Sequence, residues 1–188
     1  MNFQLTEQMP EYFDEFERML FHLPLIGSAF KKIYYDASFK RPASEFIPID
    51  QFYVSYNASN LRNADRYTHV IYKSPVDLYR EIKAEMYADI DLPEPGMINP
   101  TSFAEKMDTI IGLSPSSDSD PQYMLLEQHC YLDIEDAQSE EGESLPYIVT
   151  IEEQSRSVLS IRRNYSKDDP TKEKNVHFVH YRFVPGFG

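Results

Sequence analysis

The strongest constraint on the fold is the run of strand-like segments that follows residue 121. Residues 122–134, 147–153, 158–165 and 176–184 are rich in β-branched and aromatic residues, and polar segments separate them. The second and third of these segments are joined by the short polar turn 153–157, which is typical of a β-hairpin. This half of the chain therefore predicts antiparallel strands.

Three helices are predicted in the first 112 residues. The first covers residues 10–23, with Pro10 at its first position and Pro24 and Gly27 expected to end it. The second is capped by Ser74, and the third opens at Asn99-Pro100 and ends at Gly112. Apolar residues at helical spacing give the expected buried faces, which are Tyr12, Phe13, Phe16, Met19, Leu20 and Leu23; Leu78, Tyr79, Ile82 and Met86; and Phe103, Met107, Ile110 and Ile111.

Further strands are expected between the first two helices. They cover residues 29–35, 43–47, 51–56 and 67–72. The order of helix, strands, two helices and strands predicts an α+β fold, an antiparallel β-rich domain with an N-terminal helix and two further helices packed on it. We divide the chain into a helical arm, residues 1–28, and the domain 29–188. The apolar strand at the C-terminal end leads us to expect a piece of a longer protein.

Composition excludes several classes of function. The six glycines form no phosphate-binding loop, and the Gly-x-Gly at Gly186 has no helix after it. A formal charge of −13 argues against binding to a nucleic-acid backbone, and one cysteine excludes a multi-cysteine metal site. The first seven residues lack the basic start and apolar stretch of a signal peptide, and no apolar stretch approaches the roughly 20 residues that span a bilayer.

Two pairs of residues suggest metal or thiol chemistry at first sight. His177 and His180 are three apart on a predicted strand, so they should face opposite sides and satisfy separate hydrogen bonds. His129 and Cys130 are adjacent, so they should also face apart. We expect Cys130 to be a small buried hydrophobe on one face with Met124, Leu126, Leu132 and Ile134.

Charged residues form three further groups. Asp65 and His69 have the spacing of a base and its orienting group, but no nucleophile lies near, and Asp65 and Arg66 more simply end a loop before a strand. The acidic run 133–143 lacks the pattern of a calcium loop and predicts a solvated loop. Its expected counterpart, in the same or a neighbouring subunit, is basic: Arg156, Arg162, Arg163, Lys167, Lys172 and Lys174. These residues alone indicate no catalytic, cofactor or metal site.

Five phrases, in order, resemble one family of proteins. They are residues 27–36 (GSAFKKIYYD), 45–58 (EFIPIDQFYVSYNA), 65–69 (DRYTH), 159–165 (LSIRRNY) and 177–188 (HFVHYRFVPGFG). Together they resemble the portal, or head-to-tail connector, proteins of short-tailed phages and related prophages. The resemblance begins near residue 10 and is weakest between residues 97 and 120.

The resemblance implies a structural role without catalysis or cofactor. The chain would be the wing region of a homo-dodecameric ring at one capsid vertex of the virion, made in the bacterial cytoplasm and lacking segments at both ends. The ring would serve DNA packaging, ejection and head–tail joining. Its partners would be neighbouring portal subunits, capsid and scaffolding proteins, terminase and tail adaptors, with no membrane and no sequence-specific nucleic acid.

Two other hypotheses stay open on the sequence. One is a metal-dependent phage nuclease that uses Asp65, His69 and acids of the run 133–143. The other is an adaptor binding module that uses the hairpin 153–157 or the acidic loop as its contact surface. The nuclease requires those side chains to gather in one cleft.

Overall fold

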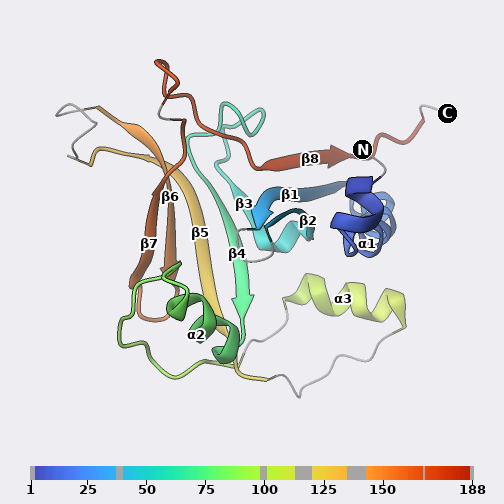
Figure 1. The fold of residues 1–188 in the computed structure, drawn as a ribbon. Helices are drawn as coiled ribbons and strands as arrows, with labels where there is room; N and C mark the ends of the chain where they lie inside the picture. Colours follow the sequence, from blue (N-terminus) through green and yellow to red (C-terminus); the bar gives the residue numbers. More distant parts are fainter. Residues whose placement is uncertain are drawn as a thin grey trace.

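Two antiparallel sheets dominate the protein (Figure 1). The computed structural model describes residues 3–36, 40–97, 101–112, 120–134, 143–166 and 168–186. In strand order, the smaller sheet contains β2 (Arg41–Ile47), β1 (Ser28–Asp36) and β8 (Phe178–Arg182). The larger contains β3 (Phe52–Val54), β4 (Tyr67–Lys73), β5 (Tyr123–Leu132), β6 (Leu145–Glu152) and β7 (Val158–Arg163). The α+β class is confirmed, and the predicted strand ends differ from these by at most two residues.

Three α-helices accompany the sheets. They are α1 (Tyr12–Ile26), α2 (Pro75–Lys83) and α3 (Ser102–Ile111), and two short helices, η1 (Gln4–Gln8) and η2 (Ile49–Gln51), precede α1 and β3. The Ser74 side chain accepts a hydrogen bond from the Asp77 amide, which confirms the predicted N-cap of α2. Thr101 caps α3, and Gly112 ends it with a φ of 85°. The expected start at Asn99-Pro100 lies outside the described residues.

The predicted end of α1 is confirmed for Gly27 and wrong for Pro24. The helix continues through Pro24 to Ile26 and ends at Gly27, which has a φ of 83° and donates its amide to the Leu23 carbonyl. Proline removes only one backbone donor, and the last turn of the helix still has the hydrogen bond from the Gly27 amide. Pro24 therefore lies inside the last turn of the helix.

The apolar faces predicted for the helices were too broad. Met19 of α1 is buried, with Phe16 and Leu23 packed beside it, whereas Phe13 and Leu20 are 57% and 50% exposed. In the other helices Leu78 and Met107 are buried, but Tyr79 and Ile110 are exposed. Met86, which was predicted on the buried face of the second helix, lies beyond the end of α2 and is also exposed. Each helix rests on one sheet or loop only, so the apolar residues at the edge of its stripe stay in solvent.

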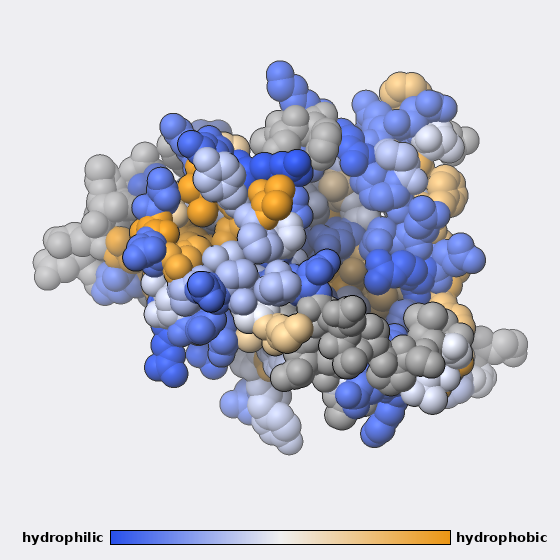
Figure 2. All heavy atoms as spheres, turned by 90° about the horizontal axis from the view of Figure 1, so that it is seen from below, coloured by the Kyte–Doolittle hydropathy of each residue, from blue (hydrophilic) through white to orange (hydrophobic). Residues whose placement is uncertain are grey.

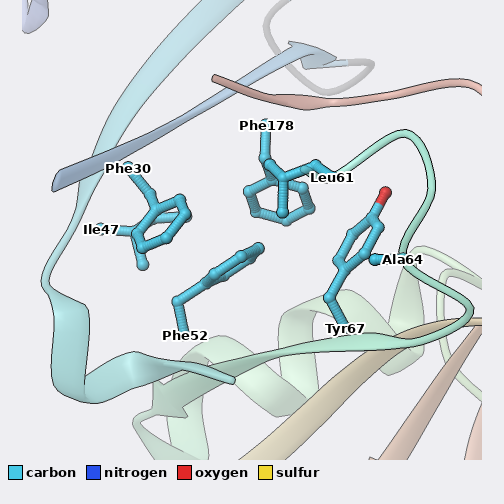
Figure 3. Close-up of a cluster of buried hydrophobic side chains, with 7 residues drawn as sticks. All are labelled: Phe30, Ile47, Phe52, Leu61, Ala64, Tyr67 and Phe178. Carbon is cyan, nitrogen blue, oxygen red and sulfur yellow. The ribbon is translucent and has the colours of Figure 1, made fainter. Parts of the chain in front are cut away.

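An aromatic core joins the two sheets (Figure 3). Phe30 of β1 and Phe178 of β8 meet Phe52 of β3, with ring centroids 4.3 and 4.8 Å apart. Tyr67 of β4 packs edge-on against Phe178 at 5.6 Å. The remaining members of this core are Ile47, Leu61 and Ala64. Burying such side chains contributes about 1.5–3 kcal/mol each, so this contact is a main source of cohesion between the sheets.

Smaller clusters attach the helices. α1 packs on the small sheet through Met19 against Ala29 and Phe46. α2 packs on one end of the large sheet through Leu78, which contacts Leu125 and Leu159. Between α2 and the small sheet, the same face of the large sheet carries the polar residues described next.

Candidate functional site

A group of buried polar side chains lies where the small sheet meets the large one. Side chains two residues apart on a strand point to the same face of a sheet. Four residues share one face of the large sheet in this way: Tyr67 and His69 on β4, and Glu127 and His129 on β5. The β4–β5 register places His69 opposite Glu127 and Tyr67 opposite His129. Lys32 reaches them from β1 of the small sheet. Tyr67, His69, Glu127 and His129 are all buried.

Glu127 is the centre of the group. Its side chain is 7% exposed, and the Lys32 Nζ lies 2.8 Å from each carboxylate oxygen. His129 Nε2 lies 3.2 Å from Oε1, and the Arg162 guanidinium lies 3.9 Å from Oε2. Burial alone would raise the pKa of Glu127, but the hydrogen bond from His129 and the Lys32 ammonium together hold it well below its usual value. The carboxylate is therefore charged and paired inside the protein.

A chain of hydrogen bonds continues from His129. Asn164 Nδ2 donates to His129 Nδ1 over 3.4 Å and to the Asn175 carbonyl over 3.0 Å. Asn164 Oδ1 accepts from His177 Nε2 over 3.0 Å. These partners assign the proton of His129 to Nε2, where it points at Glu127. Burial lowers the pKa of both histidines, so each imidazole is neutral.

His69 lies beside these hydrogen-bonded residues but takes no part in their hydrogen bonds. Its Nδ1 is buried and has no hydrogen-bond partner among the residues that the structure describes. Burial lowers its pKa to about 3, and the Lys32 ammonium acts in the same direction. His69 is thus a neutral ring that packs edge-on against Phe178 at 5.8 Å.

The buried charges of this cluster are paired with one another. A void that touches His129, Asp65 and Lys174 has no room for a water molecule. Within the described ranges, no group of His, Cys, Asp or Glu is arranged to hold a metal ion. Glu127 accepts hydrogen bonds from both Lys32 and His129. The buried charges of Glu127 and Lys32 therefore compensate each other.

The predicted separation of His129 from Cys130 is confirmed on β5, and the separate hydrogen bonds predicted for His177 and His180 are also confirmed. Cys130 lies on the opposite face from His129 and packs with Leu145, Tyr147 and Val149. His180 bonds Ser28 Oγ at 2.6 Å and stacks on Phe30, whereas His177 bonds Asn164.

The expectation about which face of β5 is buried needs a correction. Residues Leu125, Glu127 and His129 on the odd-numbered face are buried, while Cys130 and the other even-numbered side chains are half-buried. The odd face lies against α2 and the small sheet, which explains its deeper burial. Burial raises the pKa of the Cys130 thiol, with Arg66 acting in the opposite direction.

The Asp65–His69 pairing does not form. Asp65 is exposed on the loop before β4, whereas His69 points inward and has Lys32 and Glu127 as its nearest charges. Of the acidic run, residues 135–142 lie outside the described residues. Glu143 forms an ion pair with Lys172 at 2.6 Å, so one contact between the acidic and basic segments exists within this chain.

Sequence reasoning missed Glu127 and Lys32. The spacing of Glu127 and His129, two apart on a predicted strand, indicates that they share a face and was available as a signal. Lys32 carries no such signal, because its partner lies 95 residues further along the chain.

No protein-family model matches the chain, and none of the curated proteins searched is significantly similar to it. No described helix is long and apolar enough to cross a membrane.

Proposed function

We propose that this chain is the wing region of a phage portal ring and that its role is structural. The ring stands at one vertex of the capsid, where it serves DNA packaging and ejection and joins head to tail. Its partners are the neighbouring subunits of a homo-dodecamer, capsid and scaffolding proteins, terminase and tail adaptors. The chain itself performs no catalysis.

One observation carries this proposal. Four of the five phrases that resemble portal proteins meet in the aromatic core between the two sheets (Figure 3). Phe30 comes from the first phrase, Ile47 and Phe52 from the second, Tyr67 from the third and Phe178 from the last. The resemblance therefore concerns residues that hold the fold together, which is what two scaffolds of the same kind would share.

The polar cluster supports the same conclusion. A catalytic carboxylate or imidazole must reach the atoms on which it acts, whereas Glu127 is bonded to both His129 and Lys32 between the two sheets. The two named residues of the nuclease hypothesis, Asp65 and His69, lie on the surface and in the interior respectively. A scaffold needs neither an open site nor a reactive group.

The overall charge fits a ring through which DNA moves. A formal charge of −13 repels the phosphate backbone, so DNA would pass without binding to this part of the ring. The same charge favours solubility of a large assembly.

The test is the assembly state of the full-length gene product that contains residues 1–188. Native mass spectrometry and electron microscopy should show a ring of twelve subunits, and a full-length product that stays monomeric would contradict the proposal. The 188-residue chain alone should sediment as a monomer or weak oligomer. Incubation of the same samples with duplex DNA and Mg²⁺ should leave the DNA intact. Cleavage that is abolished by Asp65→Asn would support the nuclease hypothesis instead.

A further inference from the structure

A groove of about 650 Å³ lies between α1, α3 and the turn that follows β2. Its apolar part is formed by Phe21 of α1 and by Phe103 and Met107 of α3. Volumes of about 300–1,000 Å³ are typical of ligand-binding pockets, so this groove has room for several side chains of a partner.

The position of α3 creates the groove. The Thr101 hydroxyl caps the helix and also donates to the Asp50 carboxylate at 2.9 Å, which ties the start of α3 to η2. Met107 is buried, whereas Ile110 near the C-terminal end is 60% exposed. α3 is thus anchored at one end and leaves apolar surface beside α1.

The other wall is the side of α1 that faces away from the small sheet. Phe21 lies in this wall and is 46% exposed, whereas Met19 of the same helix is buried against the small sheet. Leu25, four residues further along and therefore on the same side, is 51% exposed. This side of α1 therefore offers apolar contacts to a partner in the groove.

Acidic side chains surround these apolar residues. Four carboxylates line the groove, Asp14, Glu17, Asp50 and Asp108, against one guanidinium, Arg18. Arg18 is itself bonded to Glu15 at 2.9 Å. Figure 2 shows the molecule from below, where hydrophilic side chains dominate on the side of α3 and hydrophobic ones gather on the side of α2. The field in the groove is therefore negative, with an apolar floor.

We propose that this groove binds a basic amphipathic segment of another protein, with an aromatic or aliphatic anchor on the floor and Lys or Arg beside the carboxylates. Charge complementarity selects this occupant. A second copy of the chain carries a formal charge of −13 and would be repelled, and an anionic ligand would meet four carboxylates. The inference depends on the groove and not on the portal proposal.

The probe is a fluorescein-labelled peptide of about 18 residues, made of leucine, lysine and one tryptophan with the apolar residues on one helical face. A scrambled peptide of the same composition is the control for unspecific charge attraction. Fluorescence anisotropy with the complete chain should show saturable binding of the amphipathic peptide that weakens as salt is added. The scrambled peptide should bind at least about tenfold more weakly, since its apolar residues cannot all reach the floor.

Variants locate the binding. Glu17→Gln with Asp108→Asn should weaken it about tenfold, whereas the matched pair Glu94→Gln with Glu153→Gln, exposed acids outside the groove, should change it less than about twofold. Phe21→Ser should weaken binding, and Phe3→Ser, an equally drastic change at another exposed site, should not.

Each other result overturns the inference. Equal weakening by the two acid pairs, or equal binding of the scrambled peptide, would mean unspecific attraction. Absence of binding up to about 1 mM, a free energy of only about 4 kcal/mol, would mean that the groove does not take such a segment. Self-association of the chain that Glu17→Gln with Asp108→Asn abolishes would assign the groove to a second copy.

Discussion

Lys32 and Glu127 form the most deeply buried ion pair in the described part of the protein. Their side chains are 13% and 7% exposed, and the pair links the small sheet to the large one. Placing two charges in the interior is costly, and their attraction roughly offsets that cost only while both are present. Loss of one partner should therefore harm the fold more than loss of both.

The first prediction follows from this asymmetry. Lys32→Met leaves Glu127 charged without its main partner and should lower the free energy of unfolding by about 3–5 kcal/mol at pH 7, measured by urea denaturation. Adding Glu127→Leu should recover much of that loss. The matched control is Arg80→Met, because Arg80 pairs with Asp77 in solvent and such pairs contribute about 0–1 kcal/mol. Equal losses for Lys32→Met and Arg80→Met would refute the prediction.

The buried histidines predict a sensitivity to mild acid. His69, His129 and His177 all have lowered pKa values in the folded protein, so below their ordinary value of 6.5 the unfolded chain takes up protons that the folded one does not. Stability is then fully present above pH 6.5 and falls as the pH decreases. For His69, whose pKa is about 3, the loss continues through the whole range from pH 6.5 to 3.

Replacing one of these histidines measures how much it contributes to the pH dependence of stability. His69→Leu removes a group with an unpartnered buried nitrogen and should reduce the slope of stability against pH by about 1.4 kcal/mol per pH unit between pH 6 and 4. Urea denaturation of both proteins at several pH values measures this slope. Parallel stability curves for the variant and the unmodified protein would contradict the prediction.

Only half of this cluster could be predicted from the sequence. The alternation of strand side chains places Glu127 beside His129, and it also separates His129 from Cys130. Lys32 joins them because the small sheet packs on this part of the large one, and such long-range packing has no local signature. Distance along the chain, rather than residue type, is what limited the prediction.

Among the elements, α1 tests how a helix ends. Gly27 has a φ of 83°, a conformation that is unfavourable for residues with a Cβ, and a Cβ placed there would meet no atom within 4 Å. Gly27→Ala should therefore cost about 1–2 kcal/mol through backbone strain alone, measured by thermal or urea unfolding. Gly96→Ala is the control, because Gly96 is equally open and has no positive φ. It should be neutral or slightly stabilising, and a larger loss at Gly96 would argue against the strain.

Local signals predicted the elements well and their burial less well. Ser74 and Gly112 mark helix ends because their capping depends on a few adjacent residues. Whether Phe13 or Phe16 of α1 is covered depends instead on where the small sheet lies, and periodicity treats both as one face. The exposure of Phe13 therefore became visible only in three dimensions.

For the whole molecule, the aromatic core decides whether the two sheets behave as one unit. Phe178 of the small sheet contacts rings of the large sheet, including Phe52 at 4.8 Å and His129 at 5.3 Å. Beside Phe178 the sheets are tied again by Lys32 and Glu127. Because both contacts involve the same faces, we expect the sheets to unfold together in one transition.

Phe178→Ala tests this cooperation. The change leaves a cavity between the sheets and should lower the free energy of unfolding by about 3–5 kcal/mol. Hydrogen exchange followed by mass spectrometry should then show faster exchange in β1 and in β4–β6 alike, since both sheets open together. Phe13→Ala, at an exposed position of α1, should change the free energy by less than about 1 kcal/mol. Faster exchange confined to β8 would instead mean that the strand frays locally while the large sheet keeps its own stability.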